Sequence, residues 1–181
     1  FERDIISQLA AWKTDTNRKP LVVHGARQVG KTWALKYFGR EYFDDVAYFS
    51  LDKDESGLCD VFRTTKDPQR IIQHLSFLHG KKIEPQTTLL ILDEIQECNE
   101  ALNALKYFCE EAPEYAVACA GSLLGIYLNH VGKSFPVGKV NHLYMYPLTF
   151  TEFLRTKDPV MHEYMHSIDK VCLLYTSEPT R

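Results

Sequence analysis

The sequence predicts an α/β fold in which helices cover both faces of a parallel sheet. Short apolar runs alternate with stretches of helical periodicity, and this alternation is typical of parallel sheets with right-handed crossovers. Residues 25–32, GARQVGKT, match the pattern G-x-x-x-x-G-K-[ST] between an apolar run and a helical stretch, which is the context that this pattern requires. The apolar run at residues 88–92 is followed by two adjacent acids. Together these observations favour a three-layer sandwich.

Five segments are expected to form strands. They are short, rich in aliphatic and aromatic side chains, and bounded by residues such as Asp, Gly, Ser and Pro. One of them, Thr-Leu-Leu-Ile-Leu, is apolar almost throughout, as expected of a central parallel strand buried on both faces. The five segments are residues 21–23, 46–51, 88–92, 115–120 and 140–146.

Helices are expected before the first strand and between the strands. Apolar side chains recur at helical spacing in residues 5–12. Asn99 is expected to cap a helix at residues 100–111, and Pro113 to stop it. The other helix candidates are residues 33–38, 59–62, 68–79 and 123–128 and a helix that starts at Thr149 or Thr151, while residues 132–138 are expected to form a loop.

Residues 25–32 are expected to form a phosphate-binding loop, called the phosphate loop below. Its glycines let backbone N–H groups curl around an anionic phosphate, and the N-terminus of the following helix adds partial positive charge. Lys31 would reach the β- and γ-phosphates, and Thr32 would place its hydroxyl on Mg²⁺. We therefore expect a nucleoside triphosphate to contact Gly25, Ala26, Arg27, Gln28, Val29, Gly30, Lys31, Thr32 and Trp33.

Three further side chains are expected to complete a hydrolytic site. Asp93 ends a central strand, where it would hold Mg²⁺ through water. Glu94 would orient and deprotonate an attacking water. Ser122, which follows the next strand, would hydrogen-bond the lytic water or the γ-phosphate. Gln96 has two interpretations, since it could polarise the same region or simply start a helix.

The motifs G-A-R-Q-V-G-K-T, L-I-L-D-E-I-Q, A-G-S and Y-P-L-T-F-T-E-F-L occur in that order. In this the chain resembles the prokaryotic AAA-type P-loop ATPases that carry a C-terminal domain of unknown function, from about Arg3 to Leu154. The resemblance implies a five-stranded sheet of order 5-1-4-3-2, ATP rather than GTP, and a longer natural protein. It also implies the roles given above for Lys31, Thr32, Asp93, Glu94 and Ser122. Expected partners are ATP, further copies of the chain, and a protein or nucleic-acid client bound through the C-terminal region.

The chain is expected to be a fragment with three parts. Residues 1–156 would form the ATPase core and residues 157–171 the start of a lid or linker. Residues 172–181 resemble the translation of a sequencing adapter and would be a non-native tail, although a genuine short strand with a polar end is the alternative.

Composition excludes several classes of protein. The 181 residues suffice for one domain, and 45% hydrophobic with 25% charged residues is ordinary for a soluble globular protein. No apolar run is long enough to span a bilayer, and a net charge of −3 gives no argument for nucleic-acid binding. The five cysteines lack metal-like spacing and are expected to be reduced small hydrophobes, which indicates a cytoplasmic location.

Four other functions compete with ATP hydrolysis. The sequence H-E-Y-M-H at residues 162–166 matches a zinc-protease helix, but no third protein ligand follows it in credible sequence. A GTPase would need a guanine-reading Asn/Thr-Lys-x-Asp element, and the Thr-Lys-Asp-Pro segments place Asp one position too early. A P-loop phosphotransferase would usually lack the adjacent acids. A nucleotide-gated switch with little turnover would keep the same site residues, so the sequence leaves that alternative open.

Overall fold

The computed structural model describes residues 3–52, 57–122 and 138–172. They belong to two compact units, Ile5–Pro147 and a second unit that joins the N-terminal residues to the segment starting at Leu148. The helix expected at residues 123–128, nearly all of the loop expected at 132–138, and the tail from residue 173 lie outside the described residues.

The first unit contains a parallel sheet of five strands. Its order is β2-β3-β4-β1-β5, which is the predicted order 5-1-4-3-2 counted from the other edge, so the expected fold is confirmed. Every neighbouring pair is parallel, and β1 lies between β4 and β5. The strands are β1 (Leu21–His24), β2 (Asp45–Ser50), β3 (Thr88–Asp93), β4 (Ala116–Ala120) and β5 (Asn141–Tyr144).

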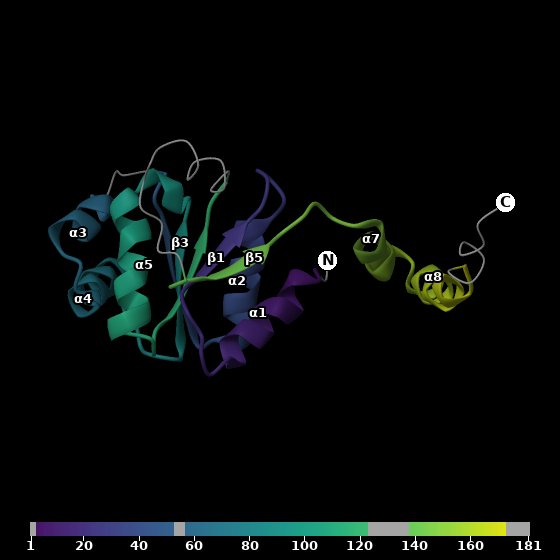
Figure 1. Cartoon of the computed structure of the whole chain (residues 1–181), viewed down its shortest axis with the longest axis horizontal. Coiled ribbons are helices and arrows are strands. Elements are labelled where there is room, and N and C mark those ends of the chain that lie inside the picture. The colour runs from purple at the N-terminus through teal and green to yellow at the C-terminus, as the bar shows by residue number, and fades with distance from the viewer. Residues whose placement is uncertain (1–2, 53–56, 123–137, 173–181) are drawn as a thin grey trace. The chain divides into compact units, whose positions relative to one another are not determined.

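Helices cover both faces of this sheet, as Figure 1 shows. One face packs against α1 (Ile5–Thr14) and α2 (Lys31–Tyr42). The other packs against α3 (Leu58–Thr64), α4 (Pro68–His79) and α5 (Asn99–Glu111). The strands supply alternate side chains to the two cores, because successive residues of a strand point to opposite faces.

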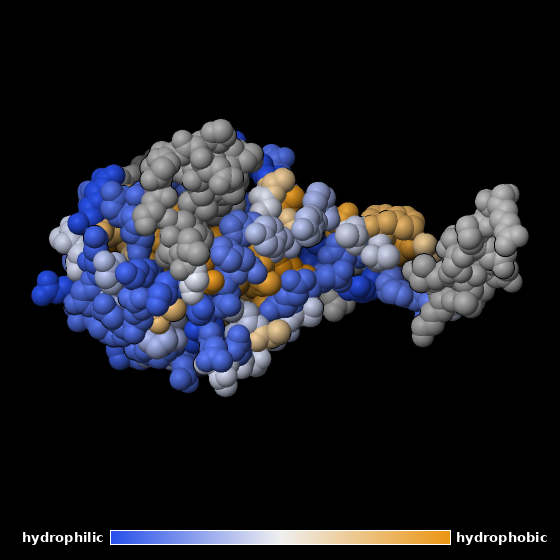
Figure 2. Space-filling model, in the orientation of Figure 1, coloured by the Kyte–Doolittle hydropathy of each residue, from blue (hydrophilic) through white to orange (hydrophobic). Residues whose placement is uncertain are grey.

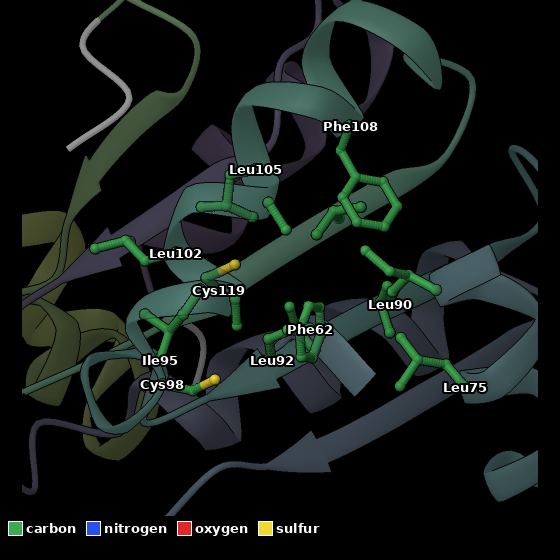
Figure 3. Close-up of a cluster of buried hydrophobic side chains, with 14 of the residues drawn as sticks. Phe62, Leu75, Leu90, Leu92, Ile95, Cys98, Leu102, Leu105, Phe108 and Cys119 are labelled. Atoms are coloured by element: carbon green, nitrogen blue, oxygen red, sulfur yellow. The ribbon is translucent and has the colours of Figure 1, made fainter. Parts of the chain in front are cut away.

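Strand β3 contributes side chains to both cores. All six of its residues are buried, as expected of a strand covered on both sides. Leu90 and Leu92 face α5, where Figure 3 shows them beside Phe108 and Phe62. Leu89 and Ile91 face α2. The apolar pattern of this one segment therefore fixes the position of the two acids that follow it.

Helix α4 begins and ends where the sequence predicts. The side chain of Asp67 accepts a hydrogen bond from the backbone N–H of Gln69, Pro68 occupies the first turn, and Gly80 ends the helix with a φ of 76°. Helix α5 differs from the prediction, since it begins at Asn99 with Cys98 as the N-cap and no side-chain cap. The prediction that Asn99 caps this helix is therefore wrong.

The second unit explains the Y-P-L-T-F-T-E-F-L motif. Thr149 and Glu152 form a reciprocal capping box at the start of α7 (Phe150–Lys157). Buried Glu152 also accepts hydrogen bonds from the guanidinium of Arg3 at 3.0 Å and from the backbone of Asp4 at 2.9 Å. The motif thus starts a helix and fastens the N-terminal residues to it.

Helix α8 (Pro159–Cys172) follows α7 in the second unit. Several large apolar side chains of this unit are exposed, and part of this apolar surface is visible in Figure 2. No helix within the described ranges has the length and apolar character needed to cross a membrane. The exposed apolar residues are Leu148, Phe150, Phe153, Val160, Met161, Tyr164, Met165 and Ile168.

A disulfide joins Cys59 of α3 to Cys98 at the start of α5. The prediction that the cysteines are reduced is therefore wrong for this pair, although Cys109 and Cys119 carry free thiols. The two bonded residues are 39 positions apart in the sequence, and the packing of α3 against α5 brings them together. Figure 3 shows Cys98 at the edge of the core beside Ile95.

Reduction of this bond is expected to lower the free energy of unfolding by about 4 kcal/mol, because a cross-link across 39 residues restricts the unfolded chain. Urea unfolding with and without a dithiol reductant measures the difference. The variant Cys59→Ser should be insensitive to reductant, whereas Cys109→Ser should keep the full response. Equal stability of the wild-type chain in both conditions would contradict the expectation.

Candidate active site

The candidate residues gather at one edge of the sheet. The phosphate loop follows β1, Asp93 ends β3, and Ser122 comes just after β4. Because the three strands are parallel neighbours, their carboxyl ends lie at the same edge, which is where ligands bind in open α/β sheets. The structure therefore brings these sequence-predicted residues together.

The conformation of the phosphate loop depends on its two glycines. Gly30 has a φ of 98°, a left-handed conformation that disfavours other residues, and α2 begins directly after it. Gly25 has a φ of 153°, and a Cβ there would lie 2.3 Å from the backbone oxygen of Met145. The chain leaving β5 therefore leaves no space for a side chain at the start of the loop.

A histidine pair borders the loop on the β5 side. Nε2 of His24 lies 2.8 Å from Nδ1 of His142, and the ring of His24 stacks on Tyr144. Burial, together with the neighbouring His142, lowers the pKa of His24 to about 4. His24 is therefore neutral at physiological pH and adds no positive charge beside the loop.

Lys31 lies inside the phosphate loop. Its Nζ donates hydrogen bonds to the carbonyl oxygens of Gly25 at 2.9 Å and Ala26 at 2.8 Å. Burial lowers the pKa of Lys31, and the carboxylates of Glu94 and Asp93 oppose that shift. The ammonium group is thus held within the loop and close to both acids.

Asp93 connects the loop to β2. Its Oδ2 accepts hydrogen bonds from the hydroxyl of Thr32 at 2.7 Å and from the hydroxyl of Tyr48 at 3.0 Å. Its Oδ1 accepts one from the backbone N–H of Glu94 at 3.1 Å. Burial and the nearby Asp93 raise the pKa of Tyr48 to about 12, so this phenol keeps its proton and acts as a donor.

Glu94 is held by polar groups from two directions. Its Oε2 accepts hydrogen bonds from the hydroxyl of Ser122 at 3.0 Å and from the amide of Gln96. Burial alone would raise the pKa of Glu94, but these hydrogen bonds and the charge of Lys31 outweigh it and lower that pKa. Glu94 is therefore ionised at neutral pH. Its backbone is left-handed, with a φ of 50°, where non-glycine residues are uncommon and found disproportionately at functional sites.

The remaining predicted residues lie around the loop or on its surface. Ala26, Arg27 and Gln28 are exposed and Val29 is half-buried. Trp33 is exposed on α2, where its ring stacks on Tyr37.

Tyr48 was not predicted from the sequence. It stands within an apolar strand and has no motif of its own. The pairing of β2 with β3 places it diagonally opposite Asp93, since Ser50 pairs with Asp93 and Tyr48 with Ile91.

The groups at this site suit a hard divalent cation bound to phosphate. The Thr32 hydroxyl and the Asp93 carboxylate are oxygen ligands in hydrogen-bond contact, and Mg²⁺ prefers oxygen ligands while keeping several waters. The residues present therefore fit the nucleotide and the metal that the loop implies.

A family of known proteins matches most of this chain. The model of the AAA domain family matches residues 17–154. Among solved structures, PCH-2 of C. elegans is similar at 13% identity over 93% of this chain, with a TM-score of 0.44. The Aeropyrum pernix ORC1 protein in complex with DNA is similar at 14% identity over 89% of this chain, with a TM-score of 0.49.

The chain spans 47% of the length of each of these two structures. No curated protein sequence matches it. The family match covers most of the chain, including the phosphate loop, both acids and the Y-P-L-T-F-T-E-F-L motif. The chain belongs to the AAA domain family and is a P-loop ATPase domain of that family.

Proposed function

We propose that this domain binds ATP with Mg²⁺ and hydrolyses it, and that hydrolysis is coupled to a protein or nucleic-acid client. The observation that carries the proposal is the arrangement of two adjacent acids with separate partners. Asp93 accepts from Thr32 of the loop, whereas Glu94 accepts from Ser122 and Gln96. One carboxylate is thus associated with the metal ligand and the other remains beside it as a base.

The phosphate loop would bind the triphosphate through its backbone and Lys31. Gly25 and Gly30 give the loop its curvature, and residues 25–33 would surround the phosphates. Lys31 already points its ammonium group into the loop, so it needs only to exchange carbonyl partners for phosphate oxygens. Thr32 would hold Mg²⁺ with an oxygen lone pair while its hydroxyl still donates its hydrogen bond to Asp93. When bound, Mg²⁺ would neutralise negative charge that develops on the phosphates during transfer.

Glu94 would act as the general base. It is ionised and fixed by two donors, so its free lone pairs can orient a water and take its proton. Ser122, which contacts Glu94 at 3.0 Å, would position that water or the γ-phosphate. Gln96 holds the same carboxylate oxygen from the other side.

The client would be engaged by parts of the protein beyond the sheet. We propose residues 1–156 as the ATPase core and residues 157–171 as the start of a lid or linker. Further copies of the chain and a C-terminal region are the proposed routes of coupling.

Release of inorganic phosphate from ATP tests this function. The chain is expected to release phosphate in Mg²⁺, to stop in excess chelator, and to be competed more strongly by ADP than by GDP. Saturable ATP binding without phosphate release would favour the nucleotide-gated switch. Release that requires an added acceptor and yields a phosphorylated product would favour a phosphotransferase.

A further inference from the structure

Four side chains from three elements, with Asp93 among them, form a closed set of contacts. Thr32 and Lys36 lie one turn apart on α2, on the same face of the helix. Thr32 donates to Asp93, and Nζ of Lys36 lies 3.3 Å from the centre of the Tyr48 ring. Tyr48 on β2 closes the set by donating to Asp93 on β3. The position of α2 over the sheet is therefore linked to the orientation of one carboxylate.

The hydrogen bonds on Asp93 leave little freedom to its carboxylate. An ionised carboxylate offers about four acceptor sites. Three are used, by the hydroxyls of Thr32 and Tyr48 and by the backbone N–H of Glu94. The remaining acceptor site suits a water molecule of a metal's hydration shell better than direct coordination of the ion.

We propose that Tyr48 is a positioning residue for the divalent cation, because its hydroxyl shares Oδ2 of Asp93 with Thr32 and holds that carboxylate toward the water shell of the ion. This inference rests on the proposed ATP–Mg²⁺ site and extends it to a residue that touches neither nucleotide nor metal. Groups that orient a metal's partners in this way typically change metal affinity by about 10- to 100-fold when removed.

Lys36 strengthens the arrangement from above the Tyr48 ring. An ammonium group over an aromatic face is attracted to it, and here the attraction keeps the phenol directed from β2 toward Asp93 on β3. Because Lys36 is on the same helix as Thr32, a shift of α2 would disturb both donors of Oδ2 together. The orientation of Tyr48 therefore depends on the position of α2, the helix that carries Thr32.

Mg²⁺ titration of nucleotide binding in Tyr48→Phe tests the proposal. Calorimetry with a non-hydrolysable ATP analogue, at increasing Mg²⁺, gives the half-saturating Mg²⁺ concentration. We expect Tyr48→Phe to raise it about 10-fold, with analogue affinity in excess chelator unchanged. Tyr115→Phe is the matched control and should behave as wild type. Tyr115 directly precedes β4, at the amino ends of the strands, whereas the site lies at their carboxyl ends.

Two further variants separate positioning from a general structural role. Lys36→Met retains the Tyr48 side chain but removes the ammonium group over its ring, and is expected to raise the half-saturating Mg²⁺ concentration by about threefold, even if Tyr48→Phe fails to fold. In an Asp93→Asn background, Tyr48→Phe should have no further effect. Equal effects of Tyr48→Phe in both backgrounds would overturn the role through Asp93.

The outcomes also distinguish this inference from the proposed function. If the wild-type chain binds the analogue equally well with and without Mg²⁺, the Mg²⁺ site fails and the role of Tyr48 fails with it. If wild-type binding depends on Mg²⁺ and Tyr48→Phe matches it, only the role of Tyr48 is overturned.

Discussion

Glu94→Gln is expected to reduce the rate of ATP hydrolysis at least about 100-fold, the scale of general base catalysis, while ATP affinity stays within about twofold of wild type. Glutamine has nearly the shape of glutamate, and its oxygen can still accept from Ser122, which contacts Glu94 at 3.0 Å. It cannot take a proton from water. The substitution should therefore remove the chemical step and leave the phosphate loop intact.

The measurement compares steady-state phosphate release with equilibrium binding of ATP for the same variant. Glu97→Gln is the matched control, because Glu97 is exposed in the turn that follows Glu94 and loses the same charge. We expect it to hydrolyse ATP at the wild-type rate. Equal rates for Glu94→Gln and wild type would remove Glu94 as the base and direct attention to Ser122 and Gln96.

Lys31→Ala is expected to weaken ATP binding by about 100-fold or more. Two charge-assisted hydrogen bonds to phosphate contribute on the order of 3 kcal/mol together, and about 1.4 kcal/mol corresponds to a tenfold change in affinity. The variant also removes the two bonds to the carbonyls of Gly25 and Ala26. The loop would then lose both a phosphate ligand and an internal support.

Ligand-induced thermal stabilisation provides the measurement, since ATP raises the melting temperature only of protein that binds it. Wild type should be stabilised by ATP in Mg²⁺, and Lys31→Ala should not be stabilised at the same concentration. Lys66→Ala, at an exposed position between α3 and α4, should respond as wild type does. Undiminished stabilisation of Lys31→Ala would contradict the assigned role of this lysine.

The strands of the sheet could be predicted because the residues that mark each strand are adjacent in the sequence. Each strand is a short apolar run next to a turn residue, and α4 is marked by Asp67, Pro68 and Gly80 within its own sequence. The strand before Ser122 was expected to lie beside the phosphate-loop strand, and β4 does pair with β1. Since β4 also pairs with β3, the contact between Ser122 and Glu94 follows from the topology.

The features that escaped prediction depend on distant parts of the chain. The bond between Cys59 and Cys98 needs α3 packed against the start of α5, and neither segment indicates that packing. Tyr48 resembles any aromatic residue of a strand until the register of β2 against β3 is known. Asn99 is of a residue type that is typical of helix caps, but it lies one position inside α5. The preference of asparagine for the cap position therefore does not decide where this helix begins.

Two backbone carbonyl groups of the phosphate loop would compete with phosphate oxygens for the ammonium group of Lys31. The carbonyl oxygens of Gly25 and Ala26 accept hydrogen bonds from this ammonium group at 2.9 and 2.8 Å. Binding of a phosphate would then exchange one set of acceptors for another. The affinity for phosphate would therefore reflect the difference in free energy between two states in which Lys31 is hydrogen-bonded. These bonds would keep the loop in its shape before a nucleotide binds, so little conformational entropy would be lost on binding.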